Sequence, residues 1–144
     1  MQIVFNVGMK RISIAATDQT PFVILDKENS KIEIRGYSFS DDTLGFYSEI
    51  VRWFKEYSKE PNQETRVILD FKYVNSTSVK FINDLLKNLD AISANGKSVT
   101  VDWLHEADDE DVQQLGNTLK EFHTIAFNII PKIISKEGGK KKMF

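Results

Sequence analysis

Residues 66–94 read RVILDFKYVNSTSVKFINDLLKNLDAISA, and this stretch decides the fold. Its first part, Arg66 to Val74, is rich in β-branched and aromatic residues, which predicts a central strand buried on both faces. From Ser78 to Ala94 the apolar residues lie on one stripe of a helix, which Asn95-Gly96 ends. The stripe consists of Ile82, Leu85, Leu86 and Leu89. A strand that leads directly into a helix is the repeating unit of an α/β fold.

The residues before this unit predict three strands and one helix. The strands are Arg11 to Ala15, Phe22 to Leu25, and Lys31 to Arg35, where strict alternation ends at Gly36. From Asp41 to Ser58 the apolar positions follow helical spacing, and the two leading aspartates suit the positive end of a helix dipole. These inward positions are Tyr47, Ile50, Val51 and Phe54.

The residues after it predict a strand, a helix and a last strand. Val99, Val101 and Trp103 alternate with polar residues, and Ile125 to Ile130 forms a strand that ends before Pro131. Between them a helix runs from about Asp109 to Phe122, with Val112, Leu115, Leu119 and Phe122 facing inward. The order β-β-β-α-β-α-β-α-β predicts an α/β domain in which a mixed sheet packs against about three helices. Its strand-helix-strand units are expected to have right-handed crossovers.

Composition excludes several classes of protein. The chain has 144 residues, enough for one domain, and 41% of them are hydrophobic, so it is expected to fold alone. Its formal net charge of −2 provides no basic field for nucleic acid. Cysteine is absent, which suits a reducing compartment. Without a visible signal peptide or an apolar run of about 20 residues, we expect a cytoplasmic protein with no membrane partner.

The chain contains no recognisable catalytic motif. Its two histidines, His105 and His123, lie in neither a GxSxG nor an HExxH pattern, and His123 is interpreted as a dipole partner at a helix C-terminus. The scattered glycines form no phosphate-binding loop. Five carboxylates, here called the acidic run, could attract a hard cation. Carboxylates at a helix start also suit the dipole, however, and the spacing of these five is not that of an EF-hand. These are Glu106, Asp108, Asp109, Glu110 and Asp111. No enzyme activity, cofactor or metal site is predicted.

Four consecutive capping-type residues, Asn75 to Ser78, occupy the junction between the central strand and its helix. One N-cap would satisfy an unpaired amide, so the surplus of hydroxyls makes this junction a candidate phosphoacceptor site. Free amides and the dipole would stabilise an added phosphate, and Lys80 could add a cation nearby. The alternative is that the four residues only turn the chain and cap the helix. Spacing alone does not decide between them.

The chain resembles the SiaC family of small bacterial regulatory phosphoproteins, whose fold is similar to the STAS domains of anti-sigma-factor antagonists. Four passages carry the resemblance: 16–21 leading to Leu25-Asp26; the Gly36-Tyr37-Ser38 turn; 75–80; and Val101-Asp102-Trp103 with the acidic run. The third is the most specific, because the family pattern at this junction is Asn-Thr-Ser-Ser-x-Lys. The chain departs from the family in having Ser76 for the threonine and Phe39-Ser40-Asp41-Asp42 after the turn.

The resemblance implies a function as well as a STAS-like fold. In the family, a partner kinase phosphorylates the first hydroxyl after the asparagine and a PP2C-type phosphatase removes the phosphate, which assigns phosphorylation to Ser76. The best-known output of the family is that the unphosphorylated form binds and activates a diguanylate cyclase and that phosphorylation prevents this contact, so a cyclase is the implied effector. Asn75, Thr77, Ser78 and Lys80 are expected to shape the site.

The predicted function is therefore non-enzymatic: partner binding switched by reversible phosphorylation of Ser76. Two alternatives remain open, namely a divalent-metal-dependent enzyme that uses the acidic run on phosphoesters, and a constitutive interaction module. Three regions are predicted: an N-terminal extension (1–8), the SiaC-like domain (9–134), and a mobile lysine-rich tail (135–144).

Overall fold

The computed structural model describes residues 9–133, so the predicted N-terminal extension and lysine-rich tail lie outside the described residues. The described part forms six strands and three helices in the predicted order. They are β1 (Ile12–Ile14), β2 (Phe22–Asp26), β3 (Lys31–Ser38), α1 (Thr43–Lys59), β4 (Glu64–Val74), α2 (Ser76–Ala94), β5 (Ser98–Glu106), α3 (Glu110–Glu121) and β6 (Ala126–Lys132). Among the helices within 9–133, none is both long and apolar enough to cross a membrane.

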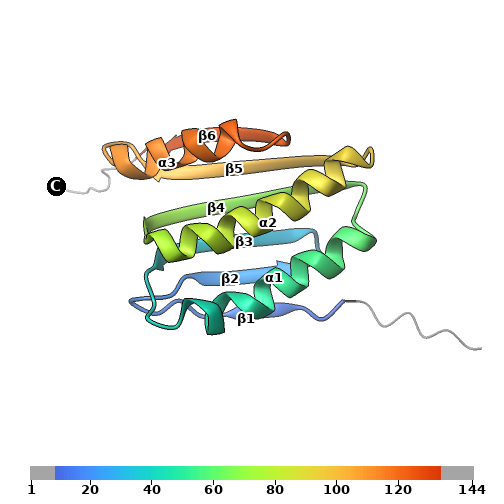
Figure 1. Cartoon of the computed structure of the whole chain (residues 1–144), viewed down its shortest axis with the longest axis horizontal. Helices are drawn as coiled ribbons and strands as arrows, with labels where there is room; N and C mark the ends of the chain where they lie inside the picture. The colour runs from blue at the N-terminus through green and yellow to red at the C-terminus, as the bar shows by residue number, and fades with distance from the viewer. Residues whose placement is uncertain (1–8, 134–144) are drawn as a thin grey trace, which may run out of the picture.

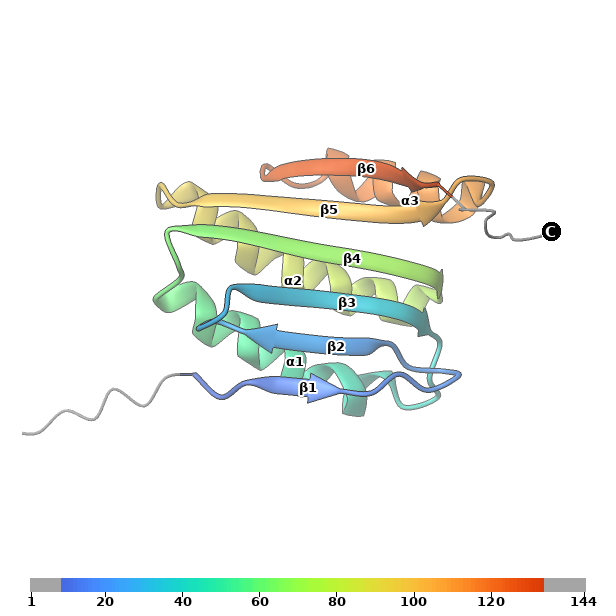
Figure 2. The same ribbon diagram turned by 180° about the vertical axis from the view of Figure 1, so that it is seen from behind.

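The strands form one mixed sheet in the order β1-β2-β3-β4-β5-β6. The pairs β1/β2 and β2/β3 are antiparallel, and the three pairs from β3 to β6 are parallel. Each helix connects two parallel neighbours, and all three helices cover the same face of the sheet (Figures 1 and 2). Crossovers of one hand that always step to the next strand place every helix on one side. The predicted α/β class is confirmed.

The core lies between the sheet and this single helical layer. Val67, Leu69 and Phe71 of β4 face the helices and are 1% exposed or less. The other face of β4 carries Arg66, which is exposed, and Asp70, which lies 3.0 Å from the guanidinium of Arg35. The prediction that β4 is buried on both faces is therefore wrong. The strand order leaves one face without helices, and charged side chains occupy it.

Most predicted boundaries shift by one to three residues in the structure, and the shifts of β3, β6 and α2 bear on the site or on the sheet. β3 continues through Gly36 to Ser38, because Gly36 adopts a φ of +123° and the register with β4 shifts by one residue there. β6 continues through Pro131 to Lys132, which an edge strand permits because the missing N–H faces no further strand. α2 begins at Ser76, two residues before the predicted start.

Phe122 was predicted to face the core, and this prediction is wrong. α3 ends at Glu121, and Phe122 follows it as the C-cap with φ −94° and ψ 0°. The helix that directs Val112 and Leu119 inward therefore ends one residue before Phe122. The Phe122 side chain is 73% exposed, which makes it one of the largest apolar surfaces in the described part of the chain.

α3 packs on the sheet through Gly116, which is buried against the indole of Trp103. A Cβ atom at Gly116 would collide with the Trp103 ring, and that ring is fixed because its Nε1 donates to the Val112 carbonyl at 2.9 Å. We expect Gly116→Ala to destabilise the protein by about 1 to 3 kcal/mol, although alanine usually stabilises a helix relative to glycine. Urea unfolding measures the difference, with the exposed-site variant Gln113→Ala as control. A Gly116→Ala protein more stable than wild type would contradict this close packing.

Candidate functional site

The candidate site is the junction where β4 ends at Val74 and α2 begins at Ser76. Asn75 is the N-cap, and its Oδ1 accepts a hydrogen bond from the Ser78 amide at 2.9 Å. The Asn75 amide donates to the carbonyl of Ser38, at the end of the neighbouring strand β3, at 3.0 Å. One of the four capping-type residues therefore caps the helix, and the other three form its first turn.

Ser78 is fully buried and belongs to a chain of hydroxyls that joins α1, β3 and α2. Its Oγ donates to the Ser38 carbonyl at 3.1 Å and accepts from the Ser38 Oγ at 2.8 Å. Because the Ser38 proton is used there, Tyr47 of α1 donates its hydroxyl to Ser38 Oγ, at 2.7 Å. Burial raises the pKa of Tyr47 to about 12, so the phenol stays neutral and can donate.

Ser76 and Thr77 are exposed, as the first two residues of α2. Their amides have no acceptor inside the helix, and none is found among the described residues. The side chain of Ser76 lies one turn from Lys80 on the same face of the helix, and Lys80 is exposed as well. The predicted accessible position of Ser76 at a helix N-terminus is confirmed. Its phosphorylation stays a prediction.

Thr77 faces a different environment from Ser76. It lines a hollow of about 480 Å³ between the starts of α1 and α2, together with Asp41, Asp42 and Phe81. A phosphate on Thr77 would therefore approach two carboxylates, whereas one on Ser76 would approach Lys80. The electrostatic surroundings favour Ser76 as the position of an added anion.

An aromatic patch beside the junction was not predicted from the sequence. Tyr37, Phe39 and Tyr73 form it and are 42%, 36% and 52% exposed. The ring centroids of Tyr37 and Phe39 are 6.2 Å apart, and those of Phe39 and Tyr73 are 5.8 Å apart, both edge to face. The parallel pairing of Tyr37 with Tyr73 brings these rings together. That pairing depends on strand register, which the local sequence does not show.

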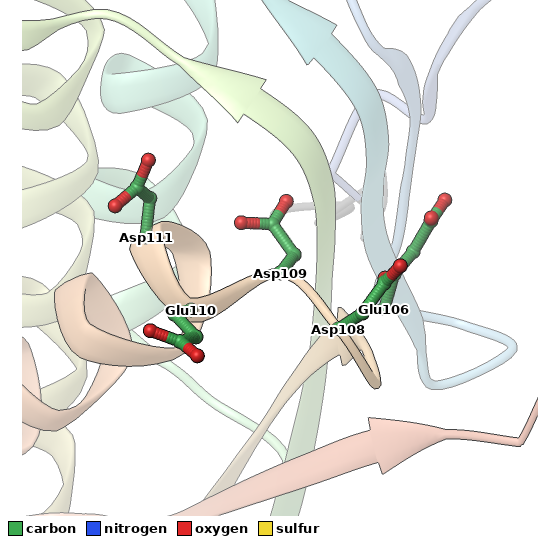
Figure 3. A pocket seen from close by; sticks show the side chains of 5 residues that line it. All are labelled: Glu106, Asp108, Asp109, Glu110 and Asp111. Carbon is green, nitrogen blue, oxygen red and sulfur yellow. The ribbon is translucent and has the colours of Figure 1, made fainter.

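The acidic run lies at the C-terminal end of β5 and the start of α3. Asp109 is the N-cap of α3 and accepts from the Val112 amide at 3.1 Å, and Glu110 and Asp111 lie in the first turn. Figure 3 shows Glu110 turned away from Asp109 and Asp111, and the five side chains line an open hollow of about 480 Å³. Within residues 9–133 no group of three or more acidic, histidine or cysteine side chains is arranged to hold a metal ion. The geometry supports the capping interpretation of this run.

The histidines have structural contacts. The His123 ring nitrogens lie 2.6 Å from Asp90 Oδ2 and 2.8 Å from Asn83 Oδ1, both on α2, so this residue ties the end of α3 to α2. The predicted role of His123 as a dipole partner therefore missed its main contacts. His105 is buried, and its Nδ1 donates to the carbonyl of Glu106 at 2.8 Å.

Comparison with known proteins agrees with this geometry. A model of the SiaC family of regulatory phosphoproteins matches residues 14–132, which include the whole β4–α2 junction. The chain belongs to the SiaC family. Members of this family are regulatory proteins, in agreement with the non-enzymatic role predicted from the sequence.

Three relatives show how far the likeness extends. An uncharacterized protein of Pseudomonas aeruginosa strain UCBPP-PA14 is 22% identical over 84% of this chain and 96% of its own length. The crystal structure of apo-SiaC from Pseudomonas aeruginosa has a TM-score of 0.76 at 22% identity, and covers 85% of this chain and 99% of that one. SiaC in its complex with the diguanylate cyclase SiaD, which it activates, has a TM-score of 0.78 at 21% identity, over 84% and 99%. The SiaC fold is thus shared over nearly the whole described chain.

Proposed function

We propose that this chain binds and regulates a diguanylate cyclase, and that reversible phosphorylation of Ser76 switches the contact off. The observation that carries the proposal is the exposed hydroxyl of Ser76 at the first position of α2, one turn from Lys80. The cyclase is suggested by the SiaC–SiaD complex, in which the related protein SiaC is the activator of the cyclase.

Ser76 suits repeated addition and removal of phosphate without damage to the fold. An anion at the first position of a helix is stabilised by free amides and by the helix dipole. Asn75 already holds the Ser78 amide, so the amides of Ser76 and Thr77 remain for the phosphate oxygens. Hydrogen bonds between the buried residues Ser78 and Ser38 fix the first turn of α2 to the end of β3.

The switch also needs two enzymes that act on Ser76. By the family resemblance these are a protein kinase and a PP2C-type phosphatase, which act on this chain in the cytoplasm. Both enzymes need the acceptor exposed, and the aromatic patch of Tyr37, Phe39 and Tyr73 gives them or the effector an apolar surface to contact beside it. Serine in place of threonine leaves the same hydroxyl chemistry at the acceptor.

Phosphopeptide mapping of the protein from its native cells tests the site. We expect phosphate on Ser76 in a fraction of the wild-type molecules, none in Ser76→Ala, and an unchanged phosphorylated fraction in the matched neighbour variant Thr77→Ala. Ser76→Ala should also co-purify with the cyclase in every growth condition. Phosphate located on another residue, or a Ser76→Ala protein whose cyclase binding still varies as in wild type, would refute the proposal.

A further inference from the structure

A groove between α2 and α3 is left unfilled by the fold. α2 packs closely on α1, whereas α2 and α3 barely approach each other above the sheet (Figure 1). The groove has a volume of about 510 Å³, and its apolar lining includes Val79 from α2, Leu115 and Leu119 from α3, and Phe122, the residue that follows α3. Phe122 is 73% exposed along it. A partly open apolar groove between two helices is a surface that amphipathic helices recognise.

The lysine and carboxylate side chains that line this groove all come from α2. Lys80 and Lys87 line it from α2 and are exposed. The anion that lines it, Asp90, is engaged by His123 at 2.6 Å and by the Thr124 amide at 3.0 Å. α3 contributes no acidic side chain to the lining, and the acidic run lies outside it. The groove therefore presents apolar surface bordered by two lysines.

We propose that this groove is the docking surface for an amphipathic helix of the effector, with acidic side chains opposite Lys80 and Lys87. The stretch of α2 from Val79 to Asp90 rises about 16 Å, so the groove fits about three turns of a partner helix. Apolar side chains at helical spacing fill the space beside Phe122, and the carboxylates pair with the lysines. The identity of the effector rests on the proposed function, whereas the chemistry of the occupant rests on the groove.

The position of Lys80 links this groove to Ser76. The two side chains lie one turn apart on the same face of α2, about 5 to 6 Å between their Cβ atoms. A phosphate on Ser76 would draw the Lys80 ammonium away from the partner and repel the partner's carboxylates at that end. A basic helix would be attracted instead. A negative charge added at Ser76 releases the occupant only if the occupant is acidic. The two lysines of the groove select an acidic occupant as well, so both arguments require a partner helix of the same charge.

Two synthetic helical peptides test the proposal on the unmodified full chain. Both carry the same leucine stripe over about 14 residues, one flanked by glutamates and the other by lysines. In fluorescence anisotropy we expect the glutamate peptide to bind at least tenfold more tightly than the lysine peptide. The double variant Lys80→Glu/Lys87→Glu should lose at least tenfold in affinity for the glutamate peptide. The matched variant Lys55→Glu/Lys59→Glu, exposed on α1, should bind as wild type.

Amide chemical shifts show where the glutamate peptide binds, and we expect the largest changes between Val79 and Lys87 and around Leu119. Absence of binding, equal losses in both double variants, or shifts centred on Tyr37 and Tyr73 would overturn the proposal. Self-association of the chain that Phe122→Ser abolishes would make a second copy the occupant and would also overturn it.

The purified cyclase separates this proposal from the proposed function. If the glutamate peptide occupies the groove but phosphorylation of Ser76 does not weaken cyclase binding, the groove stands and the switch fails. If phosphorylation releases the cyclase while Lys80→Glu/Lys87→Glu binds both cyclase and peptide as tightly as wild type, the switch stands and the groove assignment fails.

Discussion

Phosphorylation of Ser76 is expected to weaken effector binding at least a hundredfold, while the melting temperature of the chain changes by no more than about 4 °C. A phosphoserine carries nearly two negative charges, which must be desolvated in an interface that covers this helix end. An uncompensated buried charge costs about 3 to 5 kcal/mol, or a hundredfold to several thousandfold in affinity. In the free protein the same charge lies in solvent beside free amides.

Isothermal calorimetry with the purified cyclase measures the affinity of the enzymatically phosphorylated chain. Thermal unfolding of the same chain measures its melting temperature. Ser76→Asp is the weaker reagent, because it carries one charge where phosphate carries nearly two, and we expect it to produce a smaller loss. Thr77→Asp, the matched neighbour, adds the same charge beside Asp41 and Asp42. A phosphorylated chain that keeps its fold and binds the cyclase as tightly as the unmodified chain would leave a constitutive interaction module in place of the switch.

The order and type of the elements could be predicted because periodicity is a local property. The alternation of Val99, Val101 and Trp103, and the stripe from Ile82 to Leu89, each depend on residues within one segment. The errors arose where the outcome depends on other segments. Gly36 and Pro131 stay within strands because of their place in the sheet, and β4 is covered on one face because every crossover steps in the same direction.

The candidate site could be located from the sequence but not resolved into its parts. Four capping-type residues after a buried strand indicated a special helix start, and the family resemblance indicated Ser76. The sequence could not show that Ser78 is buried, because its hydroxyl partner Ser38 is 40 residues away. The groove could not be predicted either, since it follows from the exposed side chain of Phe122 at the end of α3 and from the distance between two helices.

The division of the first turn of α2 into exposed and buried hydroxyls predicts a steep difference between neighbouring substitutions. Ser78→Asp should destabilise the protein by about 3 to 5 kcal/mol, because it places a charge at a fully buried position. The new carboxylate would also face the Ser38 carbonyl, which now accepts the Ser78 hydroxyl at 3.1 Å. Ser76→Asp should leave stability unchanged or raise it by up to about 1 kcal/mol, since it adds an exposed anion at the helix start.

Urea unfolding of Ser76→Asp, Thr77→Asp and Ser78→Asp compares the same chemical change at three consecutive positions. Ser78→Ala is the control for the loss of the hydroxyl alone, and it should cost less than Ser78→Asp because it buries no charge. Should Ser78→Asp unfold too readily to purify, Ser78→Asn tests the added volume and polarity without the charge. Equal stability of Ser76→Asp and Ser78→Asp would mean that the first turn of α2 is rotated, and Ser76 would then no longer be the exposed candidate for phosphorylation.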